Sequence, residues 1–246
     1  MRQLVLVLIV FGVTAGVQGH HRVFPPSSID SRYYKVLAKH HPQSTGKWYM
    51  GRQIAEVMGP AGIPWLERPE RQKEEDIRNL IKLLKLKPGM TVADVGAGSG
   101  RLSFLMAQEL APKGRVYALE IQEKMLNTIR TKAKKLKVRN VLARQSSVNS
   151  LGLKAGVLDL VLMVDVYHEF SHPHEMVLSM VKSLKKGGRI ALVEYRGEDP
   201  KVPIKILHKM TMKQIKYEFS RPEFGLTFKE LESRLPRQHL VFFEKS

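Results

Sequence analysis

The chain has 246 residues, of which 43% are hydrophobic, so its length suits one packed domain with an extension. It contains no cysteine, which excludes disulfides, thiol catalysis and cysteine-ligated zinc. Its 41 Lys and Arg against 23 Asp and Glu give a formal charge of +18. That charge fits either an anionic partner or a lysine-rich solvated surface. We favour the solvated surface and expect no nucleic-acid partner, because the basic residues are scattered and form no recognisable nucleic-acid module.

Residues 1–19 predict an export signal, and the expected location is therefore periplasmic or secreted. Arg2 precedes the apolar run of residues 4–13, and residues 14–19 are rich in small side chains. The run is short for a membrane span, so we expect no transmembrane segment in the mature chain. An uncleaved anchor is one alternative, and a misassigned start with a cytoplasmic protein is another.

Residues 20–69 form an irregular N-terminal arm punctuated by proline and glycine. We expect short helices near residues 33–40 and 50–58. Two pairs of adjacent histidines, at 20–21 and 40–41, are interpreted as solvated, so no metal site is predicted. Residues 70–246 carry a regular alternation of helices and strands, which indicates an α/β domain.

The domain begins with an amphipathic helix over residues 70–85, whose apolar positions repeat every three to four residues. Strands are expected at 92–95, 116–120, 140–144, 158–165, 189–195, 226–231 and 238–244. Helices are expected from 101, over 124–137, from 172, and from the Thr211 cap to about 218. The strand at 158–165 is almost continuously apolar, which is typical of a central strand buried on both faces.

The most informative stretch is MTVADVGAGSGRLSF, residues 90–104, where a strand, a glycine turn and a helix follow one another. Glycines adopt positive φ and let a ligand approach the backbone closely. The following helix offers free N–H groups and a partial positive charge at its start. The spacing of Gly96, Gly98 and Gly100, followed by Arg101, differs from the G-x-G-x-x-G of dinucleotide sites.

Glu120 ends the next strand, 20 residues beyond Gly100. A carboxylate at this edge of a parallel sheet can accept both ribose hydroxyls of a nucleoside. Nicotinamide enzymes share this feature, so Glu120 by itself does not identify the cofactor.

Together these features resemble the class I S-adenosylmethionine methyltransferases. The glycine motif with Asp94, Glu120, the sequence Asp165–Phe170 after the fourth strand, and a closing pair of strands occur in the family's order and spacing. The resemblance implies a Rossmann-like seven-stranded α/β fold over residues 70–246. Its mostly parallel sheet would have helices on both faces and a C-terminal antiparallel hairpin. It also implies that residues 20–69 are a lid or a packed arm.

The resemblance further implies S-adenosyl-L-methionine as cofactor and assigns its binding residues. Asp94 would order the glycine loop, Glu120 would bind ribose, and Asp165 would position the methionine amine. Ser147 replaces the acid that reaches the adenine amino group in the family. Its hydroxyl and the Val148 amide would substitute for that acid and bind adenine more weakly. The methionine part would be cradled by the loop residues Gly96, Ala97, Gly98 and Gly100.

Methyl transfer from a sulfonium depends mainly on proximity and alignment. A base is required only when the acceptor must lose a proton. His168 is the candidate base because imidazole titrates near neutral pH, although a purely structural role remains open. Tyr167 would offer its hydroxyl or ring face to the methyl group. His208 and Lys209 would contribute to the substrate wall or bind an anionic group.

We therefore predict a methyltransferase with a small-molecule acceptor and an oligomeric state that the sequence leaves open. One alternative is a non-catalytic methyltransferase-fold protein of the cell envelope, motivated by Ser147 and the export signal. A second alternative, motivated by charge alone, is a nucleic-acid methyltransferase whose RNA affinity would fall steeply with salt.

Overall fold

The computed structural model describes residues 32–246. The predicted export signal at 1–19 and the first part of the arm lie outside the described residues. Within the described part, no helix has both the length and the apolar character to cross a membrane.

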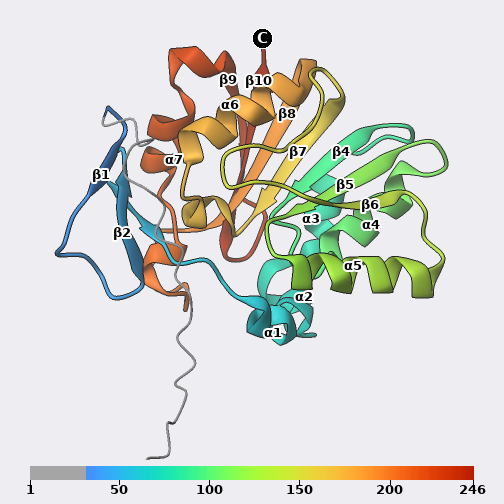
Figure 1. Cartoon of the computed structure of the whole chain (residues 1–246), viewed down its shortest axis with the longest axis horizontal. Coiled ribbons are helices and arrows are strands. Elements are labelled where there is room, and N and C mark those ends of the chain that lie inside the picture. The colour runs from blue at the N-terminus through green and yellow to red at the C-terminus, as the bar shows by residue number, and fades with distance from the viewer. Residues whose placement is uncertain (1–31) are drawn as a thin grey trace, which may run out of the picture. The chain divides into compact units, whose positions relative to one another are not determined.

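A seven-stranded sheet forms the framework, with the strand order β6-β5-β4-β7-β8-β10-β9 (Figure 1). Strands β6, β5, β4, β7 and β8 are parallel, whereas β10 runs antiparallel to both β8 and β9. This confirms the predicted fold class, including the C-terminal antiparallel hairpin. The strands are β4 (Thr91–Val95), β5 (Arg115–Glu120), β6 (Val141–Gln145), β7 (Leu158–Val164), β8 (Leu184–Tyr195), β9 (Leu226–Glu232) and β10 (Gln238–Lys245).

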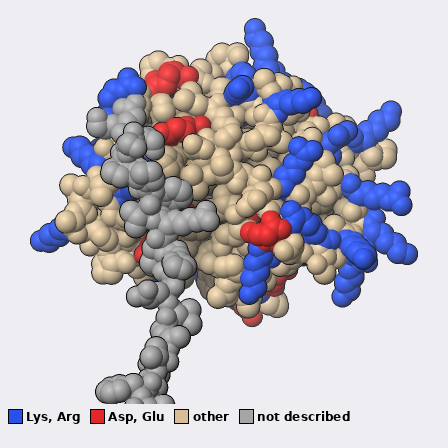
Figure 2. Space-filling model, in the orientation of Figure 1, with Lys and Arg blue, Asp and Glu red and all other residues tan. Residues whose placement is uncertain are grey.

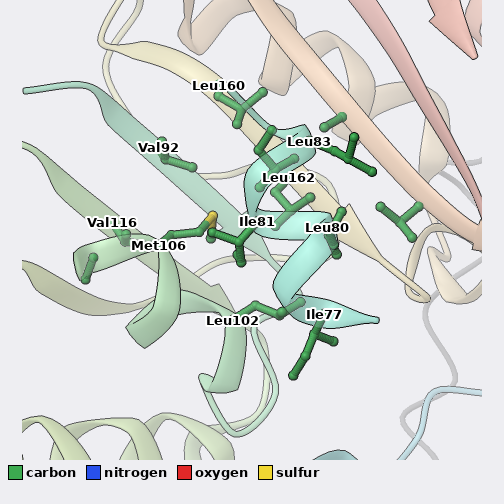
Figure 3. Close-up of a cluster of buried hydrophobic side chains, with 14 of the residues drawn as sticks. Ile77, Leu80, Ile81, Leu83, Val92, Leu102, Met106, Val116, Leu160 and Leu162 are labelled. Carbon is green, nitrogen blue, oxygen red and sulfur yellow. The ribbon is translucent and has the colours of Figure 1, made fainter. Parts of the chain in front are cut away.

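Helices cover both faces of the sheet because alternate side chains of its central strands point to opposite faces. On one face, α3 (Ile77–Leu83), α4 (Arg101–Leu110) and α5 (Glu123–Leu136) contribute to a core with Val92, Leu160 and Leu162 (Figure 3). On the other face, α6 (Pro173–Ser183) and α7 (Met212–Phe219) pack with Val161 and Met163.

The predicted single helix over residues 70–85 is wrong in detail, because the chain forms α2 (Arg71–Glu75) and α3 with a break at Asp76. Asp76 has a φ of +50°, which interrupts the right-handed helix. Its carboxylate accepts hydrogen bonds from the Asn79 backbone at 3.4 Å and from the Gln72 side chain at 2.8 Å. Asp76 therefore caps α3 rather than continuing α2.

The short helices expected near residues 33–40 and 50–58 are also wrong. The described arm forms an antiparallel sheet of β1 (Tyr34–Val36), β2 (Ser44–Tyr49) and β3 (Arg52–Ala55). Its buried aromatic side chains lie opposite one another, with Tyr34 in register with Tyr49. This small sheet is bonded to the main domain, since the Tyr34 hydroxyl donates to Glu175 at 2.5 Å.

The segment after β3 contains the short 3-10 helix η2 (Pro60–Gly62) and then α1 (Ile63–Glu67). Three further 3-10 helices follow later in the chain, namely η3 (Tyr167–Glu169), η4 (Ile206–His208) and η5 (Pro222–Phe224). Figure 2 shows Lys and Arg side chains gathered on the side where α5 lies. On that helix Lys124, Lys134 and Lys135 are exposed.

Candidate active site

The glycine turn lies where β4 meets α4, at the carboxyl end of a central strand. Gly96, Gly98 and Gly100 have φ values of +71°, +55° and +80°. A Cβ on Gly96 would lie 2.4 Å from Cγ2 of Val166, so no larger residue fits there without movement. The Leu119 carbonyl accepts hydrogen bonds from the N–H groups of Gly96 and Ala97 at 2.8 and 3.0 Å. The predicted loop residues are therefore brought together in a tight turn beside β5 and β7.

Asp94 lies beneath this turn rather than in it. Its Oδ2 accepts a hydrogen bond from the Ser103 hydroxyl at 2.5 Å, which ties β4 to the first turn of α4. Burial raises the pKa of Asp94 to about 6, against the lowering effect of the Ser103 hydrogen bond. This placement fits the predicted role of ordering the loop.

Glu120 lies at the end of β5 and is almost fully buried. Its Oε2 accepts from the Gly98 N–H at 3.1 Å, and its Oε1 accepts from the N–H groups of Ile121 and Gln122 at 2.8 and 3.1 Å. A carboxylate has about four acceptor sites, so Oε2 retains capacity for a further donor such as a ribose hydroxyl.

Asp165 follows β7 with a φ of +51° and faces the same edge of the sheet. Gln238 donates to its Oδ2 at 2.7 Å, whereas Oδ1 is buried without a hydrogen-bond partner among the described residues. Burial and the neighbouring acids Glu75 and Glu194 raise the pKa of Asp165 well above its usual value. An unpaired carboxylate oxygen beside a glycine turn fits the amine of a methionine moiety, which would supply N–H donors.

Ser147 is exposed and engaged within its own turn. Its hydroxyl donates to the Asn149 side chain at 2.8 Å, and its N–H donates to the Ser150 carbonyl at 3.0 Å. An adenine contact through the Ser147 hydroxyl stays a prediction that requires these bonds to be exchanged.

Residues 58–68, which include η2 and α1, contact the loops after β4, β5 and β7, the last through the Met58 N–H, which donates to the Glu169 carboxylate at 3.3 Å. A Cβ on Gly98 would lie 2.7 Å from Cδ1 of Leu66. Ser99 donates its hydroxyl to Glu67 at 2.6 Å, and Gln122 donates to the Met58 carbonyl at 2.9 Å. The arm therefore covers the ends of several strands, which is the placement that a lid requires.

A cluster of imidazoles and carboxylates gathers at the carboxyl end of β7, and we call it the η3 cluster. It consists of His168 and Glu169 from η3, Glu194 from β8 and His208 from η4. His168 is 1% exposed, with Nδ1 2.6 Å from Oε2 of Glu194 and Nε2 3.0 Å from Nδ1 of His208. Burial lowers the pKa of both His168 and His208 to about 4. Both rings are therefore neutral near pH 7, and His168 reaches the open side of the cluster through His208.

The two acids of the η3 cluster are also perturbed by burial. The pKa of Glu169 is raised to about 7 and that of Glu194 to about 8. Oε1 of Glu169 lies 3.6 Å from Nδ1 of His208 and 3.9 Å from Nε2 of His168. Glu194 was not predicted from the sequence, although an acid inside the apolar strand RIALVEY is the signal that could have identified it.

Tyr167 is fully buried in the core beneath α7. Its ring centroid lies 4.9 Å from that of Phe219 and 5.5 Å from that of Phe170. The Arg52 guanidinium lies 5.4 Å from the centre of the Tyr167 ring. A direct contact of Tyr167 with the methyl group stays a prediction, and these neighbours assign the ring a packing function.

The sheet order, the glycine turn and the acid after β5 define a protein of the class I methyltransferase fold. Residues 86–231 match the family model described as a methyltransferase domain. The chain belongs to this family.

Known relatives resemble the chain at low identity. The demethylmenaquinone methyltransferase of Listeria welshimeri is 27% identical over 126 residues, which are 51% of this chain and 52% of the relative. The ubiquinone/menaquinone biosynthesis C-methyltransferase of Shewanella frigidimarina is 27% identical over 119 residues, 48% of this chain and 47% of that protein. The chain thus matches about half the length of these curated relatives.

A solved SAM-dependent methyltransferase from Aquifex aeolicus superposes with a TM-score of 0.72 at 24% identity. The similarity covers 77% of this chain and 100% of the Aquifex chain. At this identity the comparison shows that the two proteins share a fold.

Proposed function

We propose that this protein transfers the methyl group of S-adenosylmethionine to a small-molecule acceptor held beside the η3 cluster. The observation that carries the proposal is the position of the glycine turn between two acids, Glu120 after β5 and Asp165 after β7. Gly98 bonds directly to Glu120, and Oδ1 of Asp165 is buried with no hydrogen-bond partner in the part of the chain that the structure describes. S-adenosylmethionine carries ribose hydroxyls in its nucleoside part and an amine in its methionine part. Glu120 would accept from the hydroxyls and Asp165 from the amine, at one edge of the sheet.

The cofactor supplies an activated methyl group on a sulfonium, and the residues supply alignment and proton transfer. Glu120 would accept from the ribose hydroxyls, and the free Asp165 oxygen would accept from the amine. The acceptor's bond to the methyl carbon forms as the carbon–sulfur bond breaks, and sulfur keeps the electron pair. Alignment of these groups is the main source of rate enhancement in such a displacement.

The acceptor's proton would leave through the η3 cluster. His208 is the half-buried member, with 21% of its side chain exposed, and it contacts His168 behind it. Oε2 of Glu194 is hydrogen-bonded to Nδ1 of His168 at 2.6 Å on the opposite side of that ring, which orients it. This arrangement suits an acceptor with a hydroxyl or an enolisable carbon, and the similarity to quinone-pathway methyltransferases supports a small aromatic compound.

Calorimetric titration of the full chain with S-adenosylmethionine and S-adenosylhomocysteine tests the donor site. We expect micromolar binding that is lost in Glu120→Ala. The matched control is Glu123→Ala, which removes an acid from the exposed start of α5. Absence of binding at millimolar ligand, from a folded chain, would overturn the proposal.

The transfer step requires a second assay, in which the chain is incubated with the donor and a panel of phenols and quinols. We expect S-adenosylhomocysteine to form with at least one member of the panel, and His208→Ala to slow its formation. Formation of product only with RNA, with no small acceptor used, would favour a nucleic-acid methyltransferase instead.

A further inference from the structure

We propose that His168, Glu169 and His208 bind a divalent transition-metal ion of the zinc type at the carboxyl end of β7. Among residues 32–246 these are the only three His or acidic side chains whose potential ligand atoms are grouped closely enough to hold an ion. Their two imidazoles and one carboxylate form a donor set that suits zinc, iron or cobalt.

The spacing of the three donor atoms fits such an ion without rearrangement of the backbone. Nε2 of His168 and Nδ1 of His208 are 3.0 Å apart, and Oε1 of Glu169 lies 3.9 and 3.6 Å from them. A point equidistant from three atoms at these separations lies about 2 Å from each, which is the length of zinc–nitrogen and zinc–oxygen bonds.

Glu194 directs His168 toward this point. Its Oε2 lies 2.6 Å from Nδ1 of His168, and its Oε1 accepts from the His168 backbone N–H at 3.3 Å. With the Nδ1 proton shared with Glu194, Nε2 of His168 would present its lone pair to an ion, an arrangement common behind metal-binding histidines. Because Glu194 comes from β8, the adjacent strand holds the ligand orientation rigidly.

The charge around the cluster also favours a cation. Arg52 is bonded bidentately to Glu218, with N–O distances of 2.8 and 3.0 Å. Within residues 32–246, neither Glu169 nor Glu194 forms an ion pair with a Lys or Arg. Arg52 also donates to the His168 backbone carbonyl at 3.1 Å and is the nearby cation that acts on Glu194, so a divalent ion would add positive charge on the His208 side of the cluster.

The site is closed on the protein side and open on one other side. His168 and Glu194 are 1% and 0% exposed as side chains, whereas His208 is 21% exposed. Three protein ligands with one accessible direction is the pattern of catalytic rather than structural zinc sites. Metal binding itself does not rest on the proposed function, but its use does. With the ion bound, Nε2 of His168 and Nδ1 of His208 would be metal ligands, so the ion would polarise the acceptor and the acceptor's proton would leave to water in place of the proton path through the η3 cluster.

Calorimetric titration of the untagged, chelator-treated full chain with zinc chloride tests the proposal, without any methyl donor present. We expect one ion per chain, with affinity lowered at least tenfold in both His208→Ala and Glu169→Gln. The matched control is His239→Ala, because His239 also contacts a carboxylate, Glu198 at 2.9 Å, but lies outside the cluster. Titration with cobalt(II) adds an independent signature, a visible absorption band that His208→Ala abolishes.

Absence of zinc binding by the folded chain would overturn the proposal. Binding that is equally strong in both cluster variants would also overturn it, because the ion would then lie elsewhere, for example on the adjacent histidines of the arm. Glu169→Gln keeps the side-chain size and decides the outcome if His208→Ala does not fold. Zinc binding without S-adenosylmethionine binding would support this inference and contradict the proposed function. S-adenosylmethionine binding without zinc binding would support the proposed function and contradict this inference.

Discussion

Gly98 donates its backbone N–H to Oε2 of Glu120 at 3.1 Å, so the glycine turn after β4 is bonded directly to the acid that ends β5. The two residues are far apart in sequence and meet because parallel strands bring their carboxyl ends to one edge of the sheet. Changes in the turn should therefore affect the cofactor more than they affect the fold.

Gly96→Ala should lower the affinity for S-adenosylmethionine by at least an order of magnitude. The new Cβ would lie 2.4 Å from Val166 at a φ of +71°, so the turn must shift away from β7. Gly152→Ala is the control, because its φ is +67° and a Cβ there meets nothing within 4 Å. Calorimetry and thermal unfolding of both variants separate the shared backbone strain from the effect on the site, and equal affinities would contradict the prediction.

Asp94 should make folding less favourable as the pH rises. Burial raises its folded-state pKa to about 6 from an ordinary value of 3.8, so the folded chain holds this proton more tightly than the unfolded chain. This contribution to the free energy of unfolding, about 2–3 kcal/mol, is fully present below pH ~4 and is lost as the pH rises through ~6. Asp94→Asn removes this contribution. Urea unfolding of both proteins at pH 4 and 7.5 measures it, and a stability difference that does not change with pH would be the contrary result.

Arg52→Met should destabilise the protein by about 3–5 kcal/mol, because it leaves the carboxylate of Glu218 buried without its partner. The pair joins β3 to α7, and its side chains are 10% and 0% exposed. Lys229→Met is the control, since the Lys229–Glu244 pair is 47% and 35% exposed and should contribute less than about 1 kcal/mol. Urea unfolding curves for both variants measure the loss in the free energy of unfolding. A loss in Arg52→Met as small as that in Lys229→Met would contradict the prediction.

Leu66→Ala should accelerate both binding and release of the cofactor if residues 58–68 are a lid. The Leu66 side chain lies over Gly98, and truncating it removes apolar contact on the order of 1 kcal/mol, or about five- to tenfold in rate. Trp65, which is 47% exposed on the same helix, provides the fluorescence signal for stopped-flow measurements. Leu178→Ala, an exposed position on α6, is the control. Unchanged rates in Leu66→Ala would indicate a packed arm instead.

The sequence by itself determined the fold class and the residues of the glycine turn. Apolar periodicity identified the sheet strands, and the positions of Gly96, Gly98, Gly100 and Glu120 follow from local rules about turns and strand ends. It failed at Asp76, whose cap splits a helical pattern. It also failed in the arm, where β1 pairs with β2 and Tyr34 lies in register with Tyr49, a pairing between separate segments that a local pattern does not show.

Only the tertiary structure decided which distant groups meet at the candidate site. His168, Glu194 and His208 come from the loop after β7, from β8 and from η4, so their spacing in sequence carries no sign of the 2.6 and 3.0 Å contacts that join them. The same holds for Leu66 over Gly98 and for Arg52 with Glu218. Such contacts depend on strand order and crossover geometry, which place the ends of separate elements together without any local pattern in the chain.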